Sequence, residues 1–463
     1  MLGKLLQPEL EELLQRGEYG VLRDVLKDMD TPDLAEMIEE LPIRETALLF
    51  RILPRTLAAD VFEYLPLERQ DELIHAMGQE QVAVLLNEMD PDDRTALLEE
   101  LPAEVTRRLL SLLSPSELAV AKQLLGYPED SIGRRMTPDY LAIKPEWTVE
   151  QVLAHIRAHG HDRETINTLY IVDERKKLVD DVRLRNILLA PANTRVEELL
   201  DHNVIALRAT DDQESAVETF RKYDRTALPV IDSDGALVGI ITVDDVLDVA
   251  EEEATEDFHR LGGLEALDLP YFATRRLVMI RKRAVWLVLL FLSGSLTVTA
   301  MGHFEDQIDQ AVVLALFVPL IIASGGNSGS QAATLVIRAL ALGELGLRDW
   351  WRVVRREILT GLALGSILGA LGFLFVMLYV LLVMEVGSPF REHRVILGLT
   401  IWAALTGVVM WGTIIGSVMP LVMKRFGVDP AVSSTPLVAT LVDVTGLIIY
   451  FSLASILLRG TLL

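Results

Sequence analysis

One acidic residue stands alone in an apolar stretch near the carboxyl end of the chain. Asp443 is the single charged residue of residues 436–458, which are numerous enough to cross a hydrocarbon core of about 30 Å. At a rise of about 1.5 Å per residue, it lies roughly 10 Å inside the start of this predicted helix. A carboxylate at that depth costs at least about 2.5 kcal/mol unless water or a cation compensates it. We therefore expect Asp443 to contact a cation. The alternative is a protonated or capping aspartate with purely structural partners.

Glycines and amides interrupt another apolar stretch. Its unusual residues are Gly325, Gly326, Asn327, Gly329 and Gln331. Because backbone groups at membrane depth must face protein or water, an irregular segment broken by these glycines is predicted to line a polar passage. Its carbonyl oxygens and amide side chains could hold a cation or its water shell. The alternative is a kink that only allows close helix contact.

A third cue is a run of acids without a base between residues 244 and 257. Its members are Asp244, Asp245, Asp248, Glu251, Glu252, Glu253, Glu256 and Asp257. The run is predicted to be a helix, so like charges would lie side by side and destabilise it unless cations intervene. A solvated acidic linker is the alternative. The position of the run, between polar domains and apolar stretches, favours metal binding together with the family resemblance given below.

The composition indicates a protein with two unlike parts. Of 463 residues, 51% are apolar and 24% are charged, which fits neither one soluble domain nor a wholly embedded protein. The net charge of −24 disfavours nucleic acid as a partner and favours cations. The chain has no cysteine, which excludes thiolate metal sites and thiol catalysis. The acidic amphipathic start predicts no cleaved signal peptide and a cytosolic amino terminus.

The first region, residues 1–130, repeats every 12 residues. The repeated apolar positions are Met29, Leu41, Leu53, Leu65, Met77, Met89, Leu101 and Leu113. Prolines follow most of them, and each proline ends one short helix or opens the next. This pattern predicts an all-α superhelical domain. It is either a plain helical spacer or a domain whose acidic edge, with Asp90, Asp92 and Asp93, faces another charged domain.

The second region, residues 131–250, contains a duplication with a period of 59 residues. Tyr170–Asp173 matches Pro229–Asp232, and each copy reads as helix, strand, turn, strand and helix. These copies resemble a pair of cystathionine-β-synthase (CBS) domains, which implies an α/β fold.

Some CBS pairs bind adenine nucleotides, so the resemblance implies an ATP site here. Arg185 and Asn186 are the nearest candidate contacts. Asp180 and Asp181 count against this function, because they stand in an expected buried strand of the first copy. Carboxylates there are costly unless they are paired or exposed.

The third region, residues 284–463, is predicted to cross the membrane five times, after a connecting helix over residues 251–283. The apolar stretches are 284–301, 311–340, 358–384, 395–423 and 436–458. Basic residues cluster before the first stretch and after the second and fourth, whereas the loop Glu305–Asp309 is acidic. This distribution predicts that the soluble domains lie inside the cell and the carboxyl terminus outside.

Taken in order, these features resemble the MgtE family of magnesium transporters over essentially the whole chain. The most specific segments are the glycine-rich stretch, the Gly427–Pro430 loop and the Pro436–Gly446 motif. The resemblance implies a homodimer in the cell membrane, in which two copies of Asp443 meet at one pore. It also implies that backbone oxygens near Ala439 and Thr435 contribute to the ion path. Mg²⁺ suits such a path, because it is a hard cation that takes oxygen ligands and sheds water reluctantly.

The acids and the resemblance together suggest a feedback gate. Abundant cytosolic Mg²⁺ would bridge the acidic run, Asp224, the acids of the helical repeats and Asp429, and so close the pore. When Mg²⁺ is scarce, the carboxylates would repel one another and the domains would part.

Two rival functions stay open: a carrier coupled to Na⁺ or H⁺, and a membrane sensor that reports metal or nucleotide status. No nucleophile and base pair, phosphate loop or catalytic metal motif indicates an enzyme.

Overall fold

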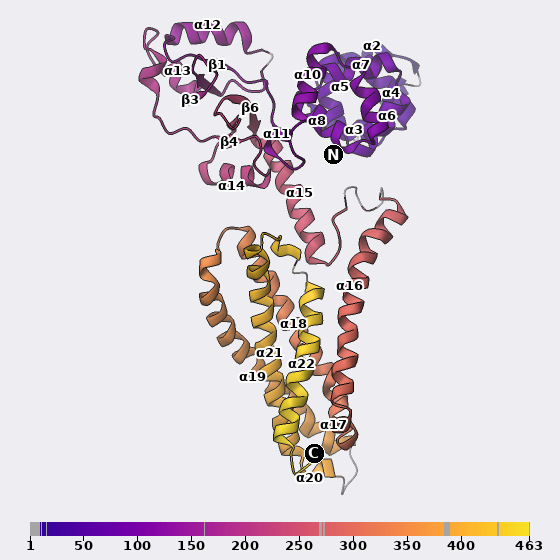
Figure 1. Cartoon of the computed structure of the whole chain (residues 1–463). Coiled ribbons are helices and arrows are strands. Elements are labelled where there is room, and N and C mark those ends of the chain that lie inside the picture. The colour runs from indigo at the N-terminus through magenta and orange to yellow at the C-terminus, as the bar shows by residue number, and fades with distance from the viewer. Residues whose placement is uncertain are drawn as a thin grey trace. The chain divides into compact units, whose positions relative to one another are not determined.

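The protein consists of two compact units, Met1–Glu251 and Glu252–Leu463. Figure 1 shows the helices and strands of each unit in a computed structural model. The structure describes residues 10, 12–14, 16–161, 163–267, 271, 274–383, 389–432 and 435–462. Separate apolar cores lie within the two units.

The first unit begins with a stack of short helices. They are α2 (Tyr19–Leu26), α3 (Thr31–Glu39), α4 (Ile43–Ile52), α5 (Arg55–Glu63), α6 (Leu67–Ala76), α7 (Gln79–Glu88), α8 (Pro91–Glu100), α9 (Ala103–Leu110) and α10 (Pro115–Leu124). Pro42, Pro54 and Pro66 each precede a helix directly. A backbone N–H at that position has no partner within the helix, so proline costs no helical hydrogen bond there. Helix α5 packs against both α3 and α7, and α4 packs against α6. The predicted all-α superhelical domain is confirmed.

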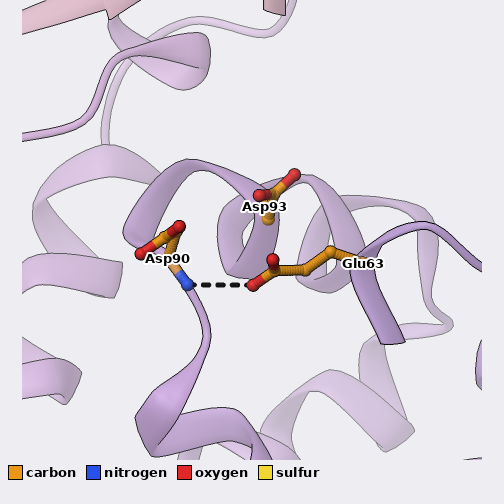
Figure 2. A group of neighbouring side chains, drawn as sticks. All are labelled: Glu63, Asp90 and Asp93. Atoms are coloured by element: carbon orange, nitrogen blue, oxygen red, sulfur yellow. Dashed lines mark hydrogen bonds between the residues drawn. The ribbon is translucent and has the colours of Figure 1, made fainter. Parts of the chain in front are cut away.

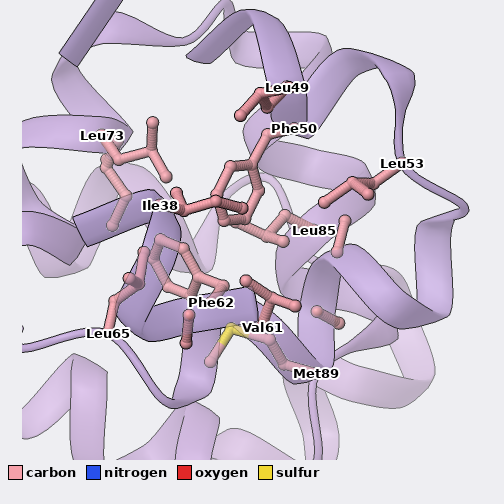
Figure 3. Close-up of a cluster of buried hydrophobic side chains, with 14 of the residues drawn as sticks. Ile38, Leu49, Phe50, Leu53, Val61, Phe62, Leu65, Leu73, Leu85 and Met89 are labelled. Atoms are coloured by element: carbon pink, nitrogen blue, oxygen red, sulfur yellow. The ribbon is translucent and has the colours of Figure 1, made fainter. Parts of the chain in front are cut away.

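One apolar core runs through this helical stack, and Figure 3 shows part of it. Residues at the 12-residue interval, among them Leu53, Leu65 and Met89, are buried in it. The rings of Phe50 and Phe62 meet edge to face with their centroids 6.2 Å apart, a favoured aromatic geometry. The sequence repeat is therefore a repeat of buried positions.

The rest of the first unit contains two three-stranded sheets of the same design. The strands are β1 (Ala142–Ile143), β2 (Thr168–Val172), β3 (Leu178–Arg183), β4 (Leu207–Arg208), β5 (Ala227–Ile231) and β6 (Leu237–Thr242). In each sheet the first strand pairs in parallel with the second, and the second pairs antiparallel with the third. Both middle strands shift register at equivalent positions, Ile171/Val172 and Val230/Ile231. The predicted duplication and its α/β fold are confirmed.

Helices flank both sheets. They are α11 (Ile132–Arg135), α12 (Val149–His159), α13 (Leu184–Leu189), the 3₁₀ helix η1 (Val196–Leu199), α14 (Glu214–Tyr223) and α15 (Val243–Leu261). Helix α15 starts directly after β6 and carries the acidic run, which is helical as predicted.

The two aspartates of β3 are compensated. Asp180 is fully buried, and its carboxylate accepts backbone hydrogen bonds from Asp181 at 2.9 Å and from His202 at 2.8 Å. Asp181 forms an ion pair with Arg225 at 3.1 Å. Because both carboxylates are satisfied, they are compatible with a strand of the fold.

The second unit is a helical bundle with five helices long and apolar enough to cross a membrane. Those helices are α16 (Arg276–His303), α18 (Val313–Ala341), α19 (Trp350–Val383), α21 (Arg394–Arg425) and α22 (Thr435–Leu457). Short helices join them, namely α17 (Glu305–Gln310), η2 (Leu347–Asp349), α20 (Pro389–Glu392) and η3 (Pro430–Val432). Helix α21 packs against α18, α19 and α22, and α16 packs against α22. The predicted five-helix membrane domain is confirmed.

The expectation of an irregular glycine segment is wrong. Helix α18 continues through Gly325, Gly326 and Gly329 without a break, so their carbonyls take part in the helix and are not free to replace the waters of an ion. The physical reason is close packing. A β-carbon at Gly412 of α21 would lie 2.5 Å from the carbonyl oxygen of Gly325, so both helices need glycine where they cross.

Candidate ion-binding sites

Asp443 of α22 faces the backbone of α18. A β-carbon at Gly326 would lie 3.3 Å from Oδ1 of Asp443 and 3.5 Å from the β-carbon of Ala439. Both Gly326 and Ala439 were predicted to lie on the ion path, and the structure brings them together with Asp443. Gly325, one residue earlier, turns instead toward Val408 and Val442.

The Asp443 carboxylate is half-buried. Within the described part of the chain, it has no hydrogen bond or ion pair. A carboxylate at membrane depth without a basic partner fits a site for a cation better than a structural ion pair.

A polar stripe follows the exposed side of α18. Asn327 and Gln331 are exposed and four residues apart, so they share one helix face. Between them, Ser330 donates a hydrogen bond to the carbonyl oxygen of Thr435 at 3.2 Å. Sequence reasoning missed Ser330, because a lone serine in a small-residue segment carries no distinctive signal.

A compact group of carboxylates lies in the first unit, and Figure 2 shows it. Ligand oxygens of Glu63, Asp90 and Asp93 lie within 4.8 Å of one another. The backbone N–H of Asp90 donates to Oε1 of Glu63 at 3.0 Å, which fixes the N-terminus of α8 beside the C-terminus of α5. Asp90 and Asp93 were predicted metal ligands. Glu63 was missed, because helix stacking alone brings it to a residue 27 positions away.

The pKa values of these carboxyl groups are raised in part by further acids nearby. Burial, followed by the charge of Asp93, raises the pKa of Glu63 to about 8. Burial and the charge of Asp245 raise the pKa of Asp93 to about 7. Burial and the charges of Asp90 and Asp245 raise the pKa of Glu164 to about 7. Carboxylates of the helical stack and of the CBS pair therefore disfavour one another's ionised forms.

Asp92 is buried and Asp245 is half-buried within this acidic cluster. Burial and the charge of Asp245 raise the pKa of Asp92 well above its usual range, and Oδ1 of Asp92 has no hydrogen-bond partner. Asp245 accepts a hydrogen bond from Thr242 Oγ1 at 2.7 Å, yet burial still raises its pKa to about 6. The pKa of Asp248 is raised by burial, with Asp244 adding to the effect. A divalent cation would relieve this uncompensated negative charge.

Other predicted regulatory acids lie elsewhere. Asp224 is the exposed left-handed C-cap of α14, with φ of 48°. In the second unit, Asp429 accepts hydrogen bonds from the backbone of Ala431 at 2.8 Å and from the guanidinium of Arg260. Sequence reasoning missed Arg260, because it stands just beyond the base-free run.

Arg260 also pairs with Glu256 one helical turn earlier. Burial and the charge of Asp429 raise the pKa of the neighbouring Asp257 to about 6. A second acidic group, with a guanidinium inside it, therefore surrounds the end of α15. Glu253 belongs to the same electrostatic group.

The candidate nucleotide contacts lie on α13. Arg185 and Asn186 are exposed there and offer donors suited to phosphate and base atoms. Tyr170 of β2 is fully buried and its hydroxyl has no hydrogen-bond partner, next to Tyr140 at a ring distance of 6.3 Å. Arg185 and Asn186 are thus the exposed donors of the first CBS copy, whereas the Tyr170 hydroxyl is enclosed in the apolar core.

Solved structures resemble about half of this chain. The cytosolic domain of a Mg²⁺ channel MgtE in complex with ATP covers 53% of this chain and 100% of its own length, with TM-score 0.51 and 37% identity. The soluble part of a magnesium transporter covers 54% of this chain and 99% of its own length, with TM-score 0.52 and 29% identity.

Sequence relatives cover more of the chain. It is 42% identical to the magnesium transporter MgtE of Thermus thermophilus over 354 residues, which is 76% of each protein. It is 32% identical to that of Bacillus subtilis over 346 residues, or 75% of this chain and 74% of the relative.

Family models agree with this similarity. The divalent cation transporter family matches residues 318–453, the MgtE intracellular N domain matches residues 29–130, and the CBS domain matches residues 130–193 and 196–252. The chain belongs to the MgtE family of magnesium transporters, which are transport proteins and not enzymes.

Proposed function

We propose that this protein is a Mg²⁺-selective channel that imports magnesium, with Asp443 in its ion path. The observation that carries the proposal is the half-buried Asp443 carboxylate, which faces Gly326 and lacks a counter-charge among the described residues. Paired carboxylates attract a divalent cation more strongly than Na⁺ or K⁺. Oxygen ligands in a roomy passage suit an ion that keeps most of its water.

The second wall of the pore comes from another copy of the chain. Asn327 and Gln331 are polar and exposed on a membrane helix, and such a face must meet water or protein instead of lipid. A homodimer that joins these faces would bring two Asp443 side chains to one axis. Ala439 and Thr435 of α22 would lie along the same path.

The soluble domains face the cytosol, as the relatives' cytosolic domain indicates. We infer that the carboxyl terminus lies outside, which five apolar helices of membrane length support. Arginines before α16, at the start of α19 and at the end of α21 support this orientation.

Cytosolic Mg²⁺ closes the pore by binding to the two acidic groups. In the first unit the ligands are Glu63, Asp90, Asp92, Asp93, Glu164, Asp244, Asp245 and Asp248. In the second unit Glu253, Glu256, Asp257 and Asp429 take this role, and Asp224 has a lesser one. Bound cations offset the repulsion among ionised, partly buried carboxylates, which favours the compact closed arrangement.

Adenine nucleotide is a second ligand of the CBS pair. The similar cytosolic domain was solved with ATP, and Arg185 and Asn186 supply suitable donors. ATP bound there would add triphosphate charge near the regulatory domains.

The decisive experiment measures Mg²⁺ uptake into liposomes that hold the purified protein. Wild-type uptake should follow membrane potential without a Na⁺ or H⁺ gradient, and Asp443→Asn should reduce it at least tenfold. Asp309→Asn, which changes an exposed acid of α17, is the matched control and should keep full uptake. Uptake that needs a Na⁺ or H⁺ gradient would indicate a carrier, and no uptake by wild type would indicate a sensor.

The gate is tested by uptake at different Mg²⁺ concentrations on the cytosolic side. Wild-type uptake should fall as cytosolic Mg²⁺ rises, and Glu63→Gln/Asp93→Asn should flatten this dependence. Glu104→Gln changes an exposed acid of α9 and should behave as wild type. Normal closure of the double variant would refute the assignment of these ligands.

A further inference from the structure

Two histidines occupy one face of α12 in the first CBS copy. His155 and His159 are separated by four residues, and their ring centroids lie 4.5 Å apart at an angle of 37°. Side chains four residues apart on a helix are neighbours. His159 is exposed and His155 is partly exposed, so solvent reaches the pair.

A backbone carbonyl sets the tautomer of the neutral His159 ring. Nδ1 of His159 lies 3.2 Å from the carbonyl oxygen of His155. Since a carbonyl only accepts, Nδ1 must carry the proton, and Nε2 of the neutral ring keeps a free lone pair. The His155 ring also makes a hydrogen bond to the backbone of Ala142.

This arrangement is typical of histidine metal ligands. A ligating histidine usually donates its second ring N–H to a carbonyl or carboxylate, which sets the ring orientation. His155 is also held edge to face against Trp147 at 5.0 Å. His159 is the last residue of α12, where the helix dipole favours a cation.

The surroundings of His155 disfavour its charged form. Burial and the neighbouring His159 lower the pKa of His155, with a smaller effect from Arg163. Arg163 itself pairs with Asp139 at 2.7 Å, which offsets its charge. A neutral imidazole is the form that binds metal.

We propose that His155 and His159 form a binding site for a borderline divalent transition metal, such as Ni²⁺, Cu²⁺, Co²⁺ or Zn²⁺. Imidazole nitrogen suits these ions, whereas Mg²⁺ prefers oxygen. No third ligating side chain joins the pair among the described residues, so water completes the coordination shell. Through this site the CBS pair would bind a transition metal separately from the carboxylate sites that bind Mg²⁺.

The test is calorimetric titration of the untagged full chain with Ni²⁺, in excess Mg²⁺ that occupies the carboxylates. Wild type should bind Ni²⁺ with two imidazole ligands, and His155→Gln/His159→Gln should bind it at least tenfold more weakly. His202→Asn is the matched control, because His202 is an exposed histidine of the same CBS pair with φ of 55°, and asparagine tolerates that conformation. This control should titrate as wild type.

Two further measurements separate the site from a folding effect. The spectrum of bound Cu²⁺ should show nitrogen coupling in wild type and lose it in the double variant, while Mg²⁺ uptake stays unchanged. Affinity for Ni²⁺ should fall as pH drops, because protonated imidazole cannot ligate. Equal Ni²⁺ binding by wild type and double variant would overturn the proposal, as would no binding by wild type.

Discussion

Gly326 and Asp443 lie opposite each other where α18 meets α22. A β-carbon at Gly326 would lie 3.3 Å from the Asp443 carboxylate, closer than an ordinary van der Waals contact. The absence of a side chain at position 326 therefore sets the space available to the carboxylate and to anything bound to it.

Gly326→Ala should slow Mg²⁺ uptake several-fold without unfolding the protein. The added methyl group would push the Asp443 carboxylate by a few tenths of an ångström but would meet Ala439 at an ordinary contact distance, so it changes the distances to a bound ion more than the packing of the bundle. Uptake into liposomes checks this expectation. Gly294→Ala on α16, where a β-carbon meets nothing within 4 Å, should leave uptake unchanged; equal slowing in both variants would contradict the role of position 326.

Gly416→Ala should destabilise the membrane domain by about 1–3 kcal/mol or more. A β-carbon at Gly416 would lie 2.0 Å from the carbonyl oxygen of Gly329, so α18 and α21 would have to separate. The apparent melting temperature in detergent measures the effect. Gly407→Ala lies on the same helix, where the nearest atom would be an ordinary 3.4 Å away. A melting temperature that falls equally in the two variants would show that helix propensity, and not the crossing, is responsible.

Local sequence patterns predicted much of this fold. The 12-residue interval marks buried positions such as Leu53 and Leu65, and the apolar stretches became membrane-length helices. Both signals are local, because the spacing of apolar residues and the length of an apolar stretch can be read within one segment of the chain. Asp443 could also be singled out, since a charge in an apolar helix is conspicuous.

Tertiary contacts were harder to predict. The partnership of Glu63 with Asp90 joins residues 27 positions apart through helix stacking, and Arg260 reaches Asp429 across 169 positions. The glycines of α18 were misread for a related reason. Whether a glycine breaks a helix or admits a neighbour depends on the facing surface, here Gly412 and Gly416 of α21, which the segment itself does not reveal.

Without Mg²⁺, the stability of the first unit should fall as pH rises from about 4.5 to about 8. Burial raises the pKa of Glu63 to about 8 and that of Asp93 to about 7. The folded chain therefore binds more protons than the unfolded chain in this window, and stability decreases as those protons leave. The apparent melting temperature across this pH range checks the sign.

Saturating Mg²⁺ should reduce this pH dependence, because the cation replaces the lost protons as the counter-charge. Asp93→Asn should also flatten the dependence in Mg²⁺-free buffer. A melting temperature that rises with pH in Mg²⁺-free wild type would contradict the assigned shifts.

Arg260→Gln should lower the melting temperature in Mg²⁺-free buffer and enlarge the gain on adding Mg²⁺. The Arg260 guanidinium forms ion pairs with Asp429 and Glu256. Asp257 lies next to them, and its pKa is raised to about 6 by burial and by the charge of Asp429. Without the Arg260 guanidinium, these carboxylates repel one another and the folded state is less stable, until a bound Mg²⁺ supplies the positive charge. Arg352→Gln is the control, because Arg352 is 86% exposed and 3.7 Å from Asp349, and such surface pairs contribute little. If the gain with Mg²⁺ were the same in wild type and Arg260→Gln, the guanidinium and the metal would not share these carboxylates.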